Sequence, residues 1–449
     1  KLNWLIQDWI VTNPRPSSME HSAPWRALET ALRLIYAWPR VFYRVPMGEI
    51  FFPATKLLML SSIWEQADYI NRFHVPSGNI LIMELVALLV VSAFFPEFKM
   101  AKPTLMDYTY FNNWILNGTP QPESCLSWPD YALKRLQGQI LEVQVYPDGV
   151  QKELTQHYHQ VVANMAEIIL ATMEAMDITP HSRFTTRVKS MWDYLAWTMR
   201  PNGKSLLNND SDLDDWRTKL LWLADMHGNN DWKYICTNGD TGSVPDGSKS
   251  SGISYNDKSV FFPYAGHVIM RDGWDNAAQF AFFDIGPFGT GHQHRDKLHV
   301  SIDANGHHWL VDSGRYWYKK GLIRDYYFQS TRAHNTIIFN GIGQRSYEQE
   351  SIKPLDINFK SEKDWDYAIG HFNGDYGFSW RELMNNPDFD KSFGPLLERL
   401  EEEGYMSTKG IPCLKKPLEH TRAVVHVHNG YWLIVDLVYG NSNHRADIL

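Results

Sequence analysis

The first part of the chain repeats apolar residues every three or four positions, which is the spacing of amphipathic helices. This spacing occurs over residues 25–35, 133–140, 161–168 and 188–199. Pro24 precedes the first of these segments, and proline is tolerated in the first turn of a helix. Because no alternating segments separate them, these helices predict an antiparallel helical array or toroid.

Two further segments of the first half predict helices for other reasons. Residues 212–227 are preceded by Ser211 and followed by Gly228, which are typical start and stop signals. Residues 80–95 form an apolar run that is too short for a comfortable membrane span and that contains Glu84. We therefore expect a buried helix there and no membrane span.

The second half of the chain alternates apolar and polar residues, and Asn-Gly pairs separate the alternating runs. Asn-Gly supplies the two positive-φ positions of a type I′ turn, so each pair predicts a β-hairpin. The pairs are Asn305-Gly306, Asn340-Gly341 and Asn429-Gly430, and strands at 299–303 and 307–312 would flank the first of them. This half is therefore expected to be an antiparallel β domain.

The two halves are joined by a polar stretch, residues 237–258, that is rich in Gly, Ser, Asp and Asn. A chain of 449 residues is too long for one ordinary core. We assign residues 1–240 to a helical domain, 241–258 to a linker and 259–449 to a β domain. A predicted strand lies close to the last residue, so we expect the natural chain to continue.

Composition narrows the function classes. The formal charge of -8 argues against a nucleic-acid binder, although a local basic cluster could still bind an anionic glycan. The 18 tryptophans suit either a core or flat sugar-binding faces. Cys125, Cys236 and Cys413 have no ligand-like spacing and allow at most one disulfide. The chain begins at Lys1 rather than Met, and we expect a secreted or periplasmic protein.

The densest group of candidate ligands lies in residues 289–299. His292 and His294 are two positions apart, so on a strand both side chains would point to the same side. Asp312 and His334 follow where the chain returns. Two imidazoles and a carboxylate suit zinc or another divalent ion. The alternative is a set of surface histidines in a His-rich hairpin.

Two other segments carry candidate residues that are ambiguous by themselves. Residues 146–159 contain a Pro-Asp-Gly turn and then a helix with Tyr158, and a tyrosine on a helix usually serves packing. Asn79 opens the apolar helix, where its ordinary role would be an N-cap.

Taken together, these motifs resemble the heparinase II/III-like superfamily of polysaccharide lyases. The resemblance covers most of the chain and rests on GNILIMELVALLVVSAFFPEFKMA, YPDGVQKELTQHYH, AGHVIMRDGWD, GTGHQHRDKLHVSI, HHWLVDSGRYWY and STRAHNTIIFNG, in family order. It implies an incomplete (α/α) toroid followed by an antiparallel β-sandwich. It also implies cleavage of a uronic-acid-containing glycan, of the glycosaminoglycan or alginate type, by β-elimination that leaves a 4,5-unsaturated uronate.

The resemblance also implies roles for individual residues. Asn79 would neutralise the uronate carboxylate, and Tyr158 would remove the C5 proton, donate to the leaving oxygen, or both. His292 would assist as a base or as a partner of the carboxylate. The implied metal ligands, with zinc as the expected ion, are His294, Asp312 and His334.

One position departs from the family pattern. Many members have His directly after the catalytic Asn, where this chain has Ile80. A base on that side of the sugar is then absent, so we expect a preference for one C5 epimer. Heparan sulfate, hyaluronan, chondroitin and alginate all remain open as substrates, as do endo or exo action and the oligomeric state.

Three other classes of protein fit the sequence less well than a lyase. The sequence HQHRD resembles the HxHxDH motif of zinc-dependent hydrolases, but Lys297 stands where the last His should be. A non-catalytic glycan-binding protein on the same fold would not need Asn79, Tyr158 and His292 together. A toroid glycoside hydrolase is disfavoured because no pair of carboxylates stands out.

Overall fold

The computed structural model forms two compact units. The helical unit comprises residues 1–145 and 161–188, and the sheet unit comprises residues 146–160 and 189–449. The described residues are 1–46, 51–100, 127–318, 323–356, 358–378, 389–404, 406–407, 412–415, 418–440 and 443–449.

The helical unit is built around one apolar helix, α5 (Gly78–Phe94), which packs against α2, α4 and α7. The predicted buried helix is therefore confirmed, and Glu84 inside it is buried with its Oε2 accepting the Val75 N–H at 2.7 Å. No helix among the described residues is long and apolar enough to cross a membrane. The other elements are α1 (Leu2–Thr12), α2 (Ala27–Tyr36), α3 (Trp38–Arg44), α4 (Pro53–Phe73), η1 (Pro96–Met100), α7 (Trp128–Gly138) and η3 (Gln139–Val143), with parts of α8 (Gln156–Ala175) and α9 (Ser182–Trp197).

Two helix starts differ from the sequence-based expectation. Helix α2 begins at Ala27, so Pro24 precedes the helix instead of lying in its first turn. Helix α10 begins at Arg217, well after Ser211, although it ends at His227 before a left-handed Gly228, as expected. The Ser211 hydroxyl is used elsewhere, as described below.

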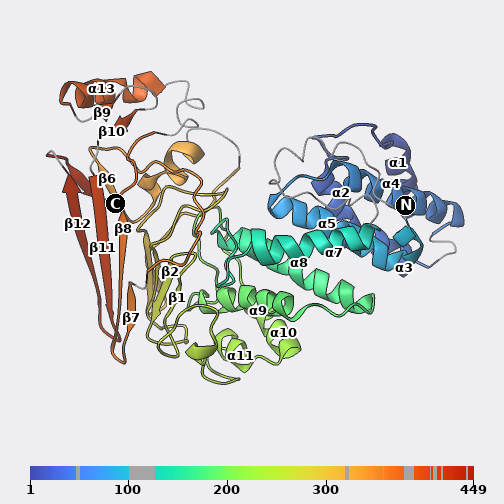
Figure 1. The fold of residues 1–449 in the computed structure, drawn as a ribbon, viewed down its shortest axis with the longest axis horizontal. Helices are drawn as coiled ribbons and strands as arrows, with labels where there is room; N and C mark the ends of the chain where they lie inside the picture. The colour runs from blue at the N-terminus through green and yellow to red at the C-terminus, as the bar shows by residue number, and fades with distance from the viewer. Residues whose placement is uncertain are drawn as a thin grey trace. The chain divides into compact units, whose positions relative to one another are not determined.

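The sheet unit contains two main antiparallel sheets (Figure 1). Helices α10 (Arg217–His227), α11 (Asn230–Cys236) and α13 (Phe389–Glu402) and the short η4 (Gly247–Lys249), η5 (Ile323–Phe328) and η6 (Thr331–Ala333) accompany them. The five-stranded sheet has the order β1 (Val260–Phe262), β2 (His267–Arg271), β3 (Phe280–Asp284), β4 (Val300–Ala304) and β5 (His307–Leu310). The four-stranded sheet has the order β12 (Trp432–Gly440), β11 (Leu418–Val427), β8 (Trp365–Phe372) and β7 (Phe359–Ser361). Two-stranded sheets pair β13 (Ala446–Ile448) with β6 (Ile337–Phe339) and β10 (Cys413–Leu414) with β9 (Met406–Ser407).

One buried cluster joins the inner faces of the two main sheets. Val268, Phe283 and Val300 come from the first sheet, and Ala368 and Val424 come from the second. Alternate residues of each strand point to one face, so shared burial of these positions means that the sheets pack face to face. The unit is thus the expected β-sandwich.

Two of the three Asn-Gly pairs have positive φ at both residues, as predicted for a type I′ turn, whereas in the pair Asn429-Gly430, which also connects two strands, only Asn429 does. Asn305 and Gly306 have φ of 53° and 76° and connect β4 to β5. Asn340 has φ of 51° in a tight turn after β6, and Asn429 has φ of 54° between β11 and β12. The turn chemistry was local and could therefore be identified from the sequence.

The segment expected to be a linker, residues 241–258, lies between α11 and β1 in chain order. It belongs to the sheet unit and contains the short η4. Its Ser251 N–H donates to Asp193 Oδ2 at 2.6 Å, which fixes the segment to the end of α9.

Candidate active site and metal centre

The start of α8 positions Tyr158 and is held by two buried asparagines. The Leu154 carbonyl accepts from Asn208 Nδ2 at 2.7 Å and from Asn209 Nδ2 at 3.0 Å. The Asn208 Oδ1 accepts from the Gln156 N–H at 3.2 Å. Side-chain oxygens that satisfy the first N–H groups of a helix fix where it begins. These contacts therefore fix the place of Tyr158 in the first turn.

The Tyr158 side chain lies between a histidine and a second tyrosine. Its ring stacks on His292, with centroids 3.6 Å apart and planes 20° apart. Its hydroxyl is hydrogen-bonded to the Tyr318 hydroxyl. Burial, and then the Tyr318 hydrogen bond, raise the pKa of Tyr158 well above its ordinary value, while the nearby Arg315 charge lowers it. At neutral pH the phenol is therefore protonated and able to donate.

His292 is oriented by a carboxylate. Its Nδ1 lies 3.0 Å from Asp210 Oδ2, while its Nε2 lies 4.0 Å from Glu153 Oε2. The His292 side chain is 27% exposed, whereas Asp210 is 1% exposed. An acceptor at Nδ1 keeps the proton there and leaves a lone pair on Nε2. The Nε2 of this partly exposed side chain can therefore accept a proton.

His292 and His294 do not lie on a strand, contrary to the expectation from their spacing. Residues 291–298 form no strand, and β4 begins only at Val300. His292 has φ of 58°, a left-handed conformation that breaks any alternation of side chains. As a result His294 is fully buried while His292 stays partly exposed.

Asp210 joins the two histidines. Its Oδ1 lies 3.1 Å from His294 Nε2, and Arg324 Nη2 lies 3.0 Å from its Oδ2. Although burial raises the pKa of Asp210, the hydrogen bonds from His292 and His294 and the Arg324 charge hold it well below its ordinary range. The carboxylate is therefore ionised, and one residue orients both imidazoles.

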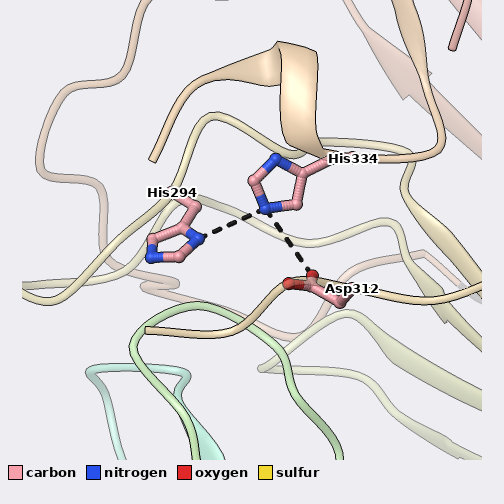
Figure 2. Close-up of side chains that lie close together, drawn as sticks. All are labelled: His294, Asp312 and His334. Carbon is pink, nitrogen blue, oxygen red and sulfur yellow. Dashed lines mark hydrogen bonds and ion pairs between the residues drawn. The ribbon is translucent and has the colours of Figure 1, made fainter. Parts of the chain in front are cut away.

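The predicted metal ligands lie together in the sheet unit (Figure 2). His294 Nδ1 is 3.2 Å from His334 Nε2, and His334 Nε2 is 3.6 Å from Asp312 Oδ2. All three side chains are buried, so they are not surface histidines of a hairpin. Bonds of about 2.0–2.1 Å to a tetrahedral zinc place neighbouring ligand atoms about 3.3 Å apart. The three side chains can therefore share one ion.

The hydrogen bonds around this cluster fit a cation. The His334 Nδ1–H donates to the Ser330 carbonyl at 2.8 Å, and the His294 Nε2–H donates to Asp210 at 3.1 Å. Each imidazole therefore directs a lone pair inward, and Asp312 Oδ2 has no hydrogen-bond donor among the described residues. Burial raises the pKa of Asp312 to about 7. Three converging ligand atoms in a buried place fit a divalent ion.

A third imidazole adjoins the cluster without offering a ligand. His299 Nδ1 accepts from the Asn335 N–H at 3.0 Å, which places its proton on Nε2. This Nε2–H donates to Ser301 Oγ at 2.8 Å and lies 3.6 Å from Asp312 Oδ2. His299 is therefore a neighbour of the metal cluster.

Asn79 belongs to the helical unit, whereas the other predicted site residues belong to the sheet unit. It is buried in the first turn of α5. The N-cap of this helix is Ser77, so the ordinary capping role considered for Asn79 is wrong. Ile80, which follows it, is half-buried.

Sequence reasoning missed the residues that organise the site. Asn208, Asn209 and Asp210 form an uninterrupted polar run that is almost fully buried, and a polar run between helices is ordinarily an exposed loop. Ser211 was interpreted as a helix start, but its Oγ accepts from the His157 N–H at 3.3 Å. Tyr318 lies far from Tyr158 in the sequence, and no local pattern indicates that their two hydroxyl groups meet.

The fold and the site define a class of protein. Residues 2–106 and 108–234 match the family described as heparinase II/III N-terminus, and residues 256–449 match heparinase II/III-like, C-terminal. The chain belongs to this heparinase II/III-like family.

Individual proteins are also similar to this chain over most of its length. The chain is 25% identical to a heparin-sulfate lyase of Pedobacter heparinus, over 87% of this chain and 59% of that protein. It is 23% identical to a heparin-sulfate lyase of Bacteroides thetaiotaomicron, over 98% of this chain and 56% of that protein. The chain thus spans somewhat more than half the length of these relatives.

Solved structures show the same fold. A crystal structure of heparinase III superposes with a TM-score of 0.71 at 19% identity, over 98% of this chain and 59% of that chain. The heparan sulfate lyase HepC from Pedobacter heparinus superposes with a TM-score of 0.62 at 21% identity, over 98% of this chain and 58% of that chain. The expected fold class, an incomplete (α/α) toroid followed by an antiparallel β-sandwich, is confirmed.

Proposed function

We propose that this chain is a polysaccharide lyase that cleaves a glycosaminoglycan of the heparan sulfate type by β-elimination. The observation that carries the proposal is the stacked pair of Tyr158 and His292, in which His292 is oriented by Asp210. A protonated phenol and an imidazole with an open Nε2 form an acid and a base side by side. The heparin-sulfate lyases among the relatives support the choice of substrate.

In the proposed reaction the His292 Nε2 accepts the C5 proton, and the electrons of that bond form the C4–C5 double bond. The C4–O bond breaks, and the Tyr158 hydroxyl donates its proton to the leaving oxygen. Asn79 is proposed to neutralise the uronate carboxylate, because the C5 proton is only weakly acidic beside a free carboxylate. The products are a new reducing end and a 4,5-unsaturated uronate.

The stacking of Tyr158 on His292 limits whether the elimination can be syn or anti. Two rings in face-to-face contact approach the sugar from one side, which suits a syn elimination. In a glucuronate the C5 hydrogen and O4 lie on the same face of the ring, whereas in an iduronate they lie on opposite faces. With Ile80 in place of a His, we propose a preference for glucuronate.

We propose zinc as the ion at His294, Asp312 and His334, since two imidazoles and one carboxylate suit this metal better than calcium or magnesium. Zinc bound there would supply a fixed positive charge in the loop that carries His292. Elimination needs no water nucleophile, so a structural role suffices. His294 in turn contacts Asp210, which orients His292.

The position of Lys297 argues against the alternative of a zinc-dependent hydrolase. Its Nζ lies 2.5 Å from Asp284 Oδ2 and 3.0 Å from the Pro287 carbonyl, and the side chain is buried. A cation in a buried ion pair cannot act as the last ligand of an HxHxDH motif. Glycosaminoglycans are extracellular, and we retain the proposal of a secreted or periplasmic location.

The test is a panel of heparan sulfate, hyaluronan, chondroitin sulfate and alginate, monitored by the ultraviolet absorbance of the new double bond. Heparan sulfate is expected to give the fastest rise. Tyr158→Phe should abolish the rise, whereas Tyr255→Phe, at an exposed tyrosine, should not. New reducing ends without absorbance would establish hydrolysis and overturn the proposal.

A further inference from the structure

A second cluster of two histidines and an aspartate lies in the four-stranded sheet, apart from the residues discussed so far. Asp366 on β8 is paired in register with His426 on β11, and His428 follows β11 directly. Asp366 Oδ2 lies 3.3 Å from His426 Nδ1 and 2.9 Å from His428 Nε2. The side chains of His426 and Asp366 are fully buried, and that of His428 is 6% exposed.

The outer nitrogen of each imidazole is committed to an acceptor. The His426 Nε2 lies 3.0 Å from Gln279 Oε1, and Gln279 is oriented by its own amide, which donates to the Gly430 carbonyl at 3.2 Å. The His428 Nδ1 lies 3.1 Å from the Lys363 carbonyl. A carbonyl accepts only, so both outer nitrogens carry protons. In the neutral form of each ring, the inner nitrogen then directs a lone pair at the same carboxylate.

The Asp366 carboxylate acts as an acceptor and donates no proton to the two imidazoles. Its Oδ2 already accepts from the Ser259 hydroxyl at 2.8 Å, and its Oδ1 accepts from the Ser361 hydroxyl. Three acceptors therefore converge in a buried place, which is the arrangement seen around His294 and Asp312.

Protonation of the two imidazoles would stabilise this group of acceptors poorly. One extra proton on His428 would make an ion pair with Asp366 but would leave His426 Nδ1 facing a carboxylate oxygen at 3.3 Å. A second proton would place two imidazolium rings 4.9 Å apart in a buried site, where like charges are costly. A single divalent ion satisfies all three groups at once.

We propose that Asp366, His426 and His428 form a second divalent metal site of the zinc class. Their ligand atoms all lie within 4.8 Å of one another, as do those of the His294 cluster. Two imidazoles and one carboxylate select zinc or a neighbouring transition ion over calcium and magnesium. The ion ties β8 to the end of β11 and to the turn that leads into β12, and its role is structural.

The experiment measures how many zinc ions each chain binds. The full chain is stripped with a chelator and titrated with zinc in equilibrium dialysis, and the wild type is expected to bind two ions per chain. His428→Gln should lose one ion, or bind it at least about 100-fold more weakly, because a ligand is worth more than a supporting contact. His334→Ala should lose the other, and the double variant should bind none. Turnover of His428→Gln at saturating zinc should stay at the wild-type level, because His428 takes no part in the proposed elimination.

A second readout is the fluorescence of Trp432, which leaves the proposed ligands unchanged. The His426 ring stacks on Trp432, with centroids 4.7 Å apart and planes 7° apart. Cu²⁺ bound at His426 should quench Trp432 fluorescence in the wild type, and Trp432→Phe should remove that quenching component. One zinc per wild-type chain, unchanged by His428→Gln and with no quenching of Trp432, would overturn the proposal in favour of an ion pair between His428 and Asp366.

Discussion

Asp210→Asn is the most informative substitution, because Asp210 serves both the acid–base pair and the metal cluster. Its carboxylate accepts from His292 Nδ1, His294 Nε2 and Arg324 Nη2. An asparagine offers one oxygen to these three donors and turns its own N–H groups toward at least one of them. Either the His292 tautomer changes or its ring loses its partner.

The magnitude follows from these contacts. Loss of the correct tautomer of a catalytic imidazole should lower kcat by about 10²–10⁴-fold, equivalent to about 3–5 kcal/mol of transition-state stabilisation. Zinc affinity should fall about 10–100-fold, because His294 loses the acceptor that orients it. Loss of the Asp210 carboxylate beside the buried Arg324 should cost up to about 3–5 kcal/mol of folding free energy, reduced by its bond to Gln329 Oε1 at 2.9 Å and its ion pair with Asp325 Oδ1 at 3.8 Å.

The assay compares Asp210→Asn with a control, Asp215→Asn. Asp215 also forms an ion pair with an arginine, Arg217, but its side chain is 38% exposed. Ultraviolet turnover, zinc content and urea unfolding are measured for both variants. Asp215→Asn should change stability by about 0–1 kcal/mol and leave turnover and zinc unchanged. If Asp210→Asn keeps both turnover and zinc affinity, the assignment of Asp210 as the residue that orients the site is wrong.

Four further outcomes are expected. Tyr158→Phe should lower turnover by about 10²–10⁴-fold with little change in unfolding free energy, since only the hydroxyl is lost; near-normal activity would remove Tyr158 from the mechanism. His334→Ala should lower the zinc content by one ion in metal analysis, and an unchanged content would show that the ion lies elsewhere. Oligosaccharides that differ only at C5 should be cleaved at unequal rates, with glucuronate preferred, and equal rates would contradict one-sided attack. Burial raises the pKa of Glu84 to about 8, so the folded chain binds this proton more tightly than the unfolded chain and stability falls as pH rises from 4.5 toward 8. Glu84→Gln should remove that slope in urea titrations and stabilise the chain by up to about 3 kcal/mol at pH 7, whereas an unchanged slope would mean that Glu84 is not the group responsible.

Local patterns predicted the division into a helical half and a β half, and several individual helices and strands. The apolar run of α5 and the Asn305-Gly306 turn depend on residues close in sequence, so their chemistry is visible in one segment. The predicted start of a helix was wrong where a polar residue can serve either as a helix cap or as a partner of a distant segment. Ser211 has the character of a helix start, yet its hydroxyl supports the first turn of α8.

The candidate ligands could also be named in advance, because few residue types bind metals and the motif order was recognisable. His294, Asp312 and His334 were expected to meet, and their side chains do converge. The expectation that His292 and His294 lie on a strand was wrong, since His292 has a left-handed backbone, although both imidazoles contact Asp210.

By itself, the sequence determined the helical first half and the β second half, the positions of the turns and the residue types available for acid–base and metal chemistry. Only the tertiary structure decided how those residues are used. Asp210, Tyr318 and Arg324 act on partners far away in the chain, and no local periodicity records such a contact. The proton positions on His292 and His294 depend on a carboxylate that lies more than eighty residues before them. A side chain's protonation and orientation are set by what surrounds it after folding, and so they emerge only when the chain has brought those neighbours together.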